Sequence, residues 1–388
     1  MLYLTASRNI YEIDIIDRGR EKGMRAIKVR LMLVMGYLGA VIGAGFASGQ
    51  EIVQFFVAYG LYGIKGGLVA TGLFALCGGM LLYLAHRWQV SNYQDMLKRM
   101  MGERTGLLID FLLALFLFLG ISTMMSASGA VFYEHLYLPK NTGILLAYVL
   151  VVAFLLTGKQ GLIISFNVLV PLKIILLLII SGYAAFFVEK QSMEIYTAFI
   201  CPTETRFWLL SAVLYVAYNF SLAMVVLSEY QTLGRPGDGI TGAIWGGLIL
   251  GVLVLVNYTA LCKFVPVVMH YEVPMLYVAG KISIPAKYIY TLVLWIGILT
   301  TAIANAYGIT QRLAGLTGLN YRFCLILCMT LALPVSMRSF SSLVSKIYPV
   351  FGILGILIIT TLIYRTTKDM AIALYYYIMQ YITHRKEA

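Results

Sequence analysis

Three glycines interrupt an apolar segment near the start of the chain. Gly43, Gly45 and Gly49 fall within the stretch GAVIGAGFASGQE, residues 39–51, where a membrane helix favours Leu or Ile. Glycine weakens a helix, and backbone N–H and C=O groups freed at bilayer depth cost several kcal/mol each unless a partner satisfies them. A break at that depth therefore lines a cavity, and we expect the binding site of a small solute there.

A carboxylate, Glu51, closes this stretch, and two interpretations of it are open. Ser48 followed three residues later by Glu51 fits a capping box, in which the carboxylate returns to the amide of the cap residue. Alternatively, an acidic group inside a membrane segment acts as a gate or carries a proton. Glu229 is predicted either in a gate at the cytoplasmic end of its segment or among the lipid headgroups.

A lysine, Lys173, lies 12 residues into the long apolar segment 161–188. At 1.5 Å per residue this is about 18 Å from the start of the segment. An unpartnered lysine at the bilayer centre costs roughly 2.5–3.5 kcal/mol, so three interpretations are open: a functional cation, a side chain that snorkels to the interface, or a structural ion pair with Glu229. Lys346 is only seven residues into its own apolar segment and can snorkel.

The composition assigns these residues to an integral membrane protein. Of 388 residues, 61% are hydrophobic and 12% are charged, with a mean hydropathy of +0.86, whereas soluble domains carry about 25% charged residues. In so apolar a chain, the net charge of +12 indicates topology and anionic lipid rather than nucleic acid. The sequence has neither H-E-x-x-H nor G-x-S-x-G, so we expect no enzyme and no cofactor.

The hydropathy pattern predicts an all-α protein with ten membrane spans, because about 20 apolar residues cross the hydrocarbon core. The predicted spans are 30–58, 63–86, 107–136, 142–158, 161–188, 207–232, 239–262, 286–311, 321–337 and 340–364. Nineteen of the 29 Lys and Arg residues fall on one side of this arrangement and eight on the other. The excess predicts that both termini are cytoplasmic.

The two halves of the chain match at an offset near 178 residues. Glu51 then corresponds to Glu229 and Pro171 to Pro349, and GISTMMSASG in the third span corresponds to GILTTAIANAYG in the eighth. Because five spans is an odd number, the second copy is inverted in the membrane. The predicted parts are a cytoplasmic N-terminal segment, a five-helix repeat, an extracellular connection, an inverted five-helix repeat and a cytoplasmic amphipathic segment, at 1–29, 30–188, 189–206, 207–365 and 366–388.

Inverted repeats of this kind place the site where matching helices are interrupted. The first span breaks at 43–49, and its counterpart in the sixth span carries the polar sequence Tyr218, Asn219, Phe220 and Ser221. We therefore expect discontinuous helices 1 and 6 that face each other near the midplane. Ser122, Ser126 and Asn305 are further candidates for the cavity wall, although serine in membrane helices also serves as packing contact.

The decapeptide GAGFASGQEI at 43–52, together with the five-plus-five organisation, resembles the YkvI-like family of bacterial membrane proteins in the amino acid-polyamine-organocation superfamily. The resemblance implies a LeuT-type fold, in which backbone amides at the break of helix 1 receive a substrate carboxylate. The implied substrate-binding residues are Gly43, Ala44, Gly45, Phe46, Ala47, Ser48, Gly49, Ser126, Tyr218, Asn219, Phe220 and Ser221.

The resemblance also implies two alternatives for the coupling ion. In sodium-coupled relatives, the ligands would be carbonyls of Gly39, Ile42 and Gly297 and the hydroxyls of Thr300 and Thr301. In sodium-independent relatives, a lysine ammonium occupies the same place, which implies Lys173 here. Two cations a few Å apart at low dielectric repel by several kcal/mol, so we expect one or the other and favour Lys173.

These interpretations lead to an expected function. We expect a secondary active transporter in the bacterial plasma membrane that moves an amino-acid-like solute by alternating access, proton-coupled or cation-independent. The alternatives are a sodium-coupled symporter that binds Na⁺ at Thr300 and Thr301, and a membrane sensor of the same fold that does not transport. The expected partners are the solute and membrane lipid, without nucleic acid, and no oligomeric state is predicted.

Overall fold

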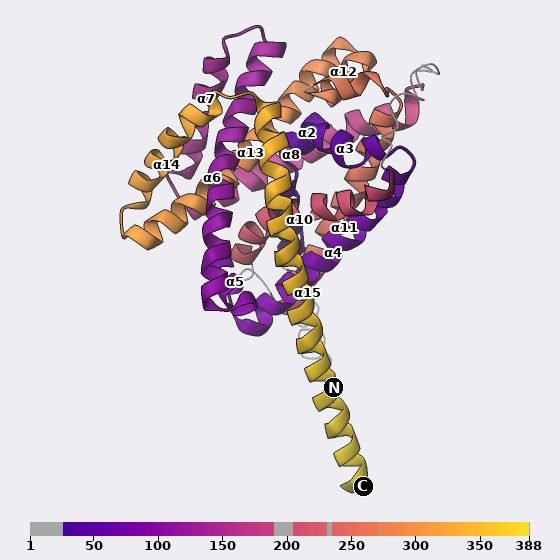
Figure 1. The fold of residues 1–388 in the computed structure, drawn as a ribbon, viewed down its shortest axis with the longest axis vertical. Coiled ribbons are helices and arrows are strands. Elements are labelled where there is room, and N and C mark those ends of the chain that lie inside the picture. Colours follow the sequence, from indigo (N-terminus) through magenta and orange to yellow (C-terminus); the bar gives the residue numbers. More distant parts are fainter. Residues whose placement is uncertain (1–25, 190–204, 231–234, 272, 388) are drawn as a thin grey trace, which may run out of the picture.

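The computed structural model describes residues 26–189, 205–230, 235–271 and 273–387, and within these ranges every regular element is a helix (Figure 1). The predicted all-α class is therefore confirmed for the described part of the chain. The predicted N-terminal segment 1–29 and the connection 189–206 lie mostly outside the described residues.

Seven helices of the described chain are long and apolar enough to cross a membrane. They are α4 (Tyr62–Trp88), α6 (Glu103–His135), α8 (Lys159–Phe187), α10 (Trp208–Tyr230), α11 (Pro236–Cys262), α13 (Ile284–Thr317) and α15 (Phe340–Glu387). Two apolar helices of 16 residues, α7 (Lys140–Leu155) and α14 (Tyr321–Ser336), are shorter. The protein is a multi-pass membrane protein, and the count of ten spans stays a prediction.

The first span is built differently from the others. A helix over residues 26–41 ends at Val41 and is followed by two short helices, α2 (Ala44–Ser48) and α3 (Gln50–Phe55). Two more short helices, α5 (Tyr93–Met101) and α12 (Pro274–Ile282), lie between long ones. The Asn92 side chain caps α5 by accepting a hydrogen bond from the amide of Asp95 at 2.8 Å. α13 ends at Thr317, and Gly318 after it has a φ of 69°.

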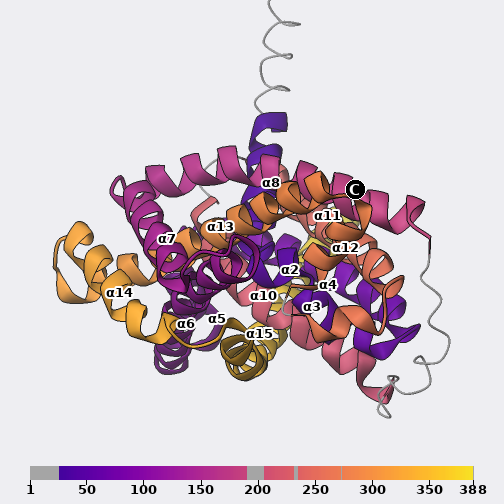
Figure 2. The same ribbon diagram turned by 90° about the horizontal axis from the view of Figure 1, so that it is seen from above.

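Small residues bring the long helices close together. α11 packs along α4, where a Cβ added to Gly247 would lie 2.4 Å from the backbone N of Ala75. At Gly251 an added Cβ would lie 2.0 Å from Thr71 Oγ1. In the absence of a hydrophobic driving force between helices in lipid, such close approach is what holds them. The group α4, α10 and α11 faces a second group, α6, α7, α13 and α14, with α8 and α15 in contact with both (Figure 2).

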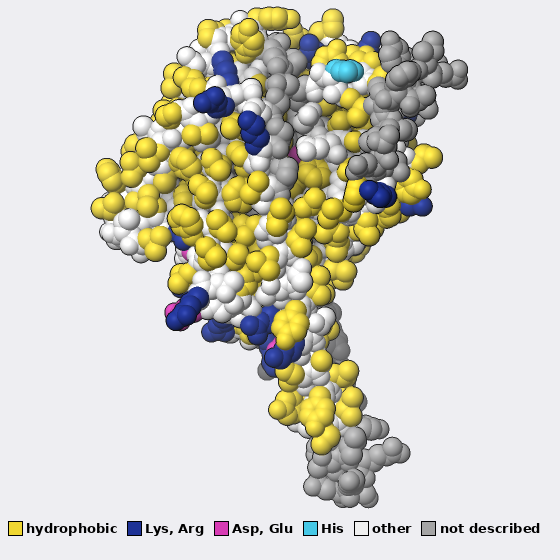
Figure 3. All heavy atoms as spheres, in the orientation of Figure 1, with side chains coloured by type: hydrophobic (Ala, Val, Ile, Leu, Met, Phe, Trp, Pro, Cys, Tyr) yellow, Lys and Arg dark blue, Asp and Glu magenta, His cyan; other side chains and the backbone are white. Residues whose placement is uncertain are grey.

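Both described ends of the chain lie at the same end of the helical body. Arg30 pairs with Asp238 at 2.8 Å and Arg87 with Asp369 at 3.6 Å, which joins the first helix to α11 and α15 to α4 at that end. A broad apolar surface covers the middle of the displayed face, with most of the visible Lys and Arg above or below it (Figure 3). The C-terminal end of α15 projects beyond the body (Figure 1), and its residues 370–380 are all exposed.

Candidate functional site

The first helix breaks within the glycine-rich stretch. Ile42 and Gly43 are not helical, Gly43 is extended with φ −95° and ψ −164°, and Gly49 adopts a φ of 81° between α2 and α3. Gly49 thus has a backbone conformation that suits glycine. Because the chain leaves the helix at Ile42, the carbonyl of Ile42 is free to accept a bond from another element.

The side chain of Lys173 on α8 makes that bond. Its Nζ donates to the Ile42 carbonyl at 2.6 Å and to Thr300 Oγ1 at 2.8 Å, and Thr300 Oγ1 donates in turn to the Gly297 carbonyl at 3.1 Å. Lys173 is fully buried. The ammonium therefore joins three elements: the broken first helix, α8 and α13.

The helix α13 forms one wall of the break. An added Cβ at Gly297 would lie 3.3 Å from both Ala47 Cβ and the Gly43 carbonyl oxygen, so a glycine here lets the two backbones approach. Thr301 faces Gly43, where an added Cβ would lie 2.6 Å from Thr301 Oγ1. The Thr301 hydroxyl is buried and has no hydrogen-bond partner among the described residues. Gly39, by contrast, lies against Phe166 and Val170.

The predicted break in the sixth span is wrong. α10 is helical without interruption from Trp208 to Tyr230. Its polar side chains bond within the helix, because Asn219 Nδ2 donates to the Tyr215 carbonyl at 3.0 Å and Ser221 Oγ to the Ala217 carbonyl at 2.8 Å. This segment also contains neither glycine nor proline, so nothing in it forces the backbone out of the helix. Tyr218, Asn219, Phe220 and Ser221 are all buried.

The capping-box interpretation of Glu51 is also wrong. The N-cap of α3 is Gly49, without a side-chain cap, and Ser48 Oγ accepts from the Gln50 amide at 3.2 Å while donating to the Gly45 carbonyl at 3.0 Å. The Glu51 side chain instead turns back over Gly45, whose added Cβ would lie 1.9 Å from Glu51 Oε1. Glu51 is 4% exposed, and no group in the described part of the chain donates a hydrogen bond to its Oε2.

Two predicted site residues form bonds away from the break. Ser126 Oγ donates to the Arg338 carbonyl at 2.6 Å, in the turn before α15. Glu229 Oε2 accepts from Lys159 Nζ at 2.7 Å, at the ends of α10 and α8. The alternative in which Lys173 pairs with Glu229 is therefore wrong, because each has another partner.

Two known proteins of Bacillus subtilis (strain 168) are similar to the chain over most of its length. The chain is 32% identical over 334 residues to the membrane protein YkvI of Bacillus subtilis (strain 168), with 85% of this chain and 94% of YkvI covered. The chain belongs to the YkvI-like family of membrane proteins. It is also 25% identical over 330 residues to the protein YyaD of the same organism, covering 84% of this chain and 94% of YyaD. No model of a known protein family matches the chain.

Solved structures share the fold of this YkvI-like chain. MhsT in complex with L-phenylalanine matches with a TM-score of 0.60 at 15% identity, covering 85% of this chain and 88% of MhsT. A Na⁺-coupled sialic acid symporter matches with a TM-score of 0.56 at 12% identity, covering 84% and 75%. A manganese transporter of Eremococcus coleocola matches with 0.54 at 13% identity, covering 87% and 76%. The likeness shows the LeuT-type fold, and none of these proteins is named as an enzyme.

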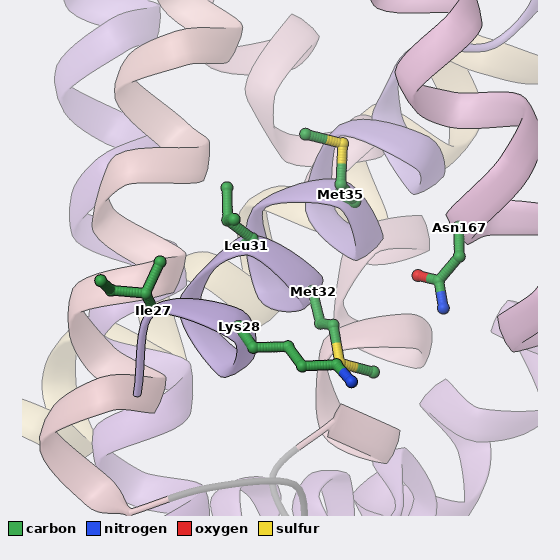
Figure 4. Close-up of a pocket in the computed structure, with 6 residues that line it drawn as sticks. All are labelled: Ile27, Lys28, Leu31, Met32, Met35 and Asn167. Carbon is green, nitrogen blue, oxygen red and sulfur yellow. The ribbon is translucent and has the colours of Figure 1, made fainter. Parts of the chain in front are cut away.

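A cavity of about 540 Å³ lies beside the first helix of the YkvI-like chain. Figure 4 shows Met35 and Met32 on that helix and Asn167 on α8 across the cavity from them. The first helix and α8 meet at Gly39, against Phe166 and Val170, and are separated by the cavity nearer the start of the helix. The lining residues of the first helix lie on both sides of Arg30, so the cavity is at that end of the body and not at the break.

Two aromatic residues beside the break were not predicted from the sequence. The ring of Tyr215 on α10 packs against Phe55 of α3, and that of Tyr348 on α15 stacks on Tyr218, with centroids 5.6 and 5.1 Å apart. Tyr215 lies three residues before Tyr218 and could have been found from helical spacing, which places both on one face. Tyr348 lies 297 residues from Glu51 in the sequence, and only the packing of α15 on α10 brings it there.

Proposed function

We propose that this chain is a secondary active transporter that moves a small amino-acid-like solute across the bacterial plasma membrane by alternating access. The break at residues 43–49 is the proposed substrate site, lined on the α10 side by Tyr218 and Asn219. Support comes from the interrupted first helix and from the fold shared with a manganese transporter and a Na⁺-coupled symporter.

The proposal includes a topology of ten spans in an inverted five-plus-five arrangement. α7 and α14 are then two short spans, and the interrupted first helix with α2 and α3 is a third span outside the seven long ones. The end of the body that holds Arg30, Arg87 and Asp369 is the proposed cytoplasmic end, because that side carries the excess of basic residues. The ion pair of Lys159 and Glu229 belongs to the gate at this end.

The observation that carries the proposal is the contact of the Lys173 ammonium with the broken helix. A charged donor makes hydrogen bonds roughly twice as strong as a neutral one. Protonated Lys173 therefore ties the Ile42 carbonyl firmly to Thr300 on α13, and loss of the proton loosens that link. A group whose charge changes the hold on a broken helix is suited to couple proton movement to opening of the site.

The sodium-coupled alternative has one observation in its favour. The Thr301 hydroxyl faces Gly43 and is buried without a partner, and a hard cation favours such oxygen ligands. Sodium at this position would lie near the ammonium, and two unit charges 4 Å apart repel by about 4 kcal/mol at an effective dielectric constant of 20. Sodium coupling therefore requires Lys173 to be neutral.

Solute flux under imposed gradients tests the proposal. The purified chain is reconstituted into liposomes, and uptake of each of the twenty radiolabelled amino acids is followed with an inward proton gradient, an inward sodium gradient or neither. We expect saturable uptake of at least one amino acid that is independent of sodium. Uptake that requires sodium would favour Thr300 and Thr301 as ion ligands, and binding without flux above that of empty liposomes would favour a sensor.

A further inference from the structure

Two carboxylates are buried in the described part of the chain, and they differ in how their charge is balanced. Asp110 on α6 pairs with Arg312 on α13, with Arg312 Nη2 2.9 Å from Asp110 Oδ2. Glu51 is equally buried, yet none of the ion pairs among the described residues includes it, and its Oε2 accepts no hydrogen bond. Burying a charged carboxylate without a cation is costly, and the described residues supply no positive partner for Glu51.

The surroundings of Glu51 are aromatic. The ring centroid of Phe55 on α3 lies 5.6 Å from that of Tyr215 and 5.7 Å from that of Tyr218, both on α10. Tyr218 in turn stacks on Tyr348 of α15, with centroids 5.1 Å apart. Tyr218 and its neighbour Asn219 also place polar side chains within hydrogen-bonding reach of the Glu51 carboxylate. Three helices thus contribute rings around one carboxylate.

A carboxylate and several aromatic rings together favour one class of ligand. Aromatic faces attract a cation by about 0.5–2 kcal/mol, and more strongly when it is desolvated. An organic ammonium can meet the carboxylate with its N–H groups and the rings with its carbon-bound face. A bare metal ion gains little here, because the described residues hold no group of three or more His, Cys, Asp or Glu side chains that would coordinate it.

We propose that Glu51, with Phe55, Tyr215, Tyr218 and Tyr348, is a subsite for the protonated amino group of the transported solute. This inference rests on the proposed function, because it assigns the solute to the break, and it adds that the solute must carry a free amine. Glu51 lies directly over Gly45 in the break, so an ammonium bound to its carboxylate lies beside the backbone of α2. The solute class is thereby narrowed from amino-acid-like molecules in general to those with an unblocked amine.

The Gly45 position supports the same assignment. A side chain at 45 would overlap Glu51 Oε1 and Cδ, where an added Cβ would lie at 1.9 and 2.5 Å. Only a glycine leaves the carboxylate room against the break. Substitution of Gly45 by alanine therefore moves the carboxylate without removing its charge. The variant tests whether the position of the Glu51 carboxylate matters as well as its charge.

The experiment compares matched ligands that differ only at the amine. Thermal stabilisation of the full chain in detergent is measured with L-leucine, L-phenylalanine and L-lysine, with the corresponding amines 3-methylbutylamine, phenethylamine and cadaverine, and with the three N-acetyl amino acids. We expect at least one free amine to bind and its N-acetyl form to bind at least 100-fold more weakly. Glu51→Gln is expected to weaken binding of the free amine at least 30-fold, and Gly45→Ala at least 10-fold.

The matched control is Glu103→Gln, which removes an exposed carboxylate at the start of α6 and is expected to change affinity less than twofold. Because Glu51→Gln could lower expression, Glu51→Asp serves as a second variant that keeps the charge but draws it back, with an intermediate affinity expected. The comparison of free and acetylated ligands needs only the wild-type chain.

Several results would overturn the subsite. They are N-acetyl ligands that bind as well as their parents, Glu51→Gln affinities within threefold of wild type, and a wild-type chain stabilised by none of the free amines. Normal amine binding in Glu51→Gln with loss of proton-driven uptake would make Glu51 a proton carrier instead. Failure of the proposed function looks different: the free amine binds in detergent and depends on Glu51, but liposomes show no flux.

Discussion

At the scale of single residues, the described chain handles its buried charges in three ways. Lys173 has two oxygen acceptors from separate helices, at 2.6 and 2.8 Å. Asp110 and Arg312 neutralise each other, with side chains only 5% and 8% exposed. Glu51 has Tyr218 and Asn219 as neighbours but no cation among the described residues. Lys173 and Glu51 lie beside the break, whereas the Asp110–Arg312 pair joins α6 to α13 and has a structural role.

The structural role of the Asp110–Arg312 pair gives a stability prediction. Asp110→Asn leaves the Arg312 guanidinium buried without its counter-ion, which costs about 3–5 kcal/mol in comparable buried pairs. We expect a clear fall in the melting temperature of the detergent-solubilised chain, measured by intrinsic fluorescence. The control is Asp369→Asn, because its pair with Arg87 is longer, at 3.6 Å, and more exposed, and such pairs contribute about 1 kcal/mol or less. Equal melting temperatures for the two variants would contradict this account.

At the scale of the elements, the sequence identified the break in the first helix but not the course of α10. Gly43 and Gly49 predicted the break because glycine both weakens a helix and adopts a positive φ, as Gly49 does at 81°. The polar residues of α10 led to the wrong prediction of a break there, because Asn219 and Ser221 donate to carbonyls four residues back in the same helix. The short helix α5 was missed, although Asn92 followed by Asp95 is a capping signal.

Contacts between residues on distant helices of the site could not be predicted from the sequence, because they depend on tertiary packing. The resemblance supplied Lys173, Ile42 and Thr300 as candidates for one cation position, and the helices α8 and α13 hold these side chains together. The rings around Glu51 come from α3, α10 and α15, and their meeting depends on tertiary packing alone. Hydropathy identifies helices, but it does not say which faces of distant helices meet.

The contact between α4 and α11 gives a prediction at this scale. Gly247→Ala places a methyl group 2.4 Å from the backbone of α4, so the two helices must move apart, and such overpacking costs about 1–3 kcal/mol. We expect a lower melting temperature than for wild type. Gly237→Ala on the same helix is the control, because an added Cβ there meets nothing within 4 Å. A Gly247→Ala chain as stable as Gly237→Ala would show that the close approach is not needed.

At the scale of the whole molecule, the helical body and the end of α15 are distinct. Residues 365–369 of α15 attach to the body, where Arg365 Nε donates to the Met100 carbonyl at 2.7 Å and Tyr83 Oη donates to Asp369 at 2.8 Å. Beyond them, the consecutive apolar residues 374–379 are all exposed, with Tyr377 at 69%. The sequence predicts that this part lies along the cytoplasmic membrane surface, but α15 is helical without a break from Phe340 to Glu387, so in the structure it continues the line of the span away from the body (Figure 1).

Removal of this projection should leave the body intact. A chain that ends at Asp369 keeps the contacts of Arg365 and Asp369 with α4 and α5 and loses side chains that are exposed in the structure. We expect its melting temperature to differ from that of the full chain by no more than about 2 °C, in line with the small effects of surface changes. A loss of more than this, or aggregation of the truncated chain in detergent, would mean that residues beyond 369 support the body.

The central claim is that the Lys173 ammonium occupies the cation position at the break, and one binding measurement tests it most directly. Thermal stabilisation by the twenty amino acids is measured with and without sodium in wild type, Lys173→Ala and the control Lys346→Ala, which removes an exposed lysine of α15. We predict a stabilisation that is indifferent to sodium, is lost in Lys173→Ala and persists in Lys346→Ala. Stabilisation of the wild type that requires sodium would contradict the claim and would assign the cation to Thr300 and Thr301.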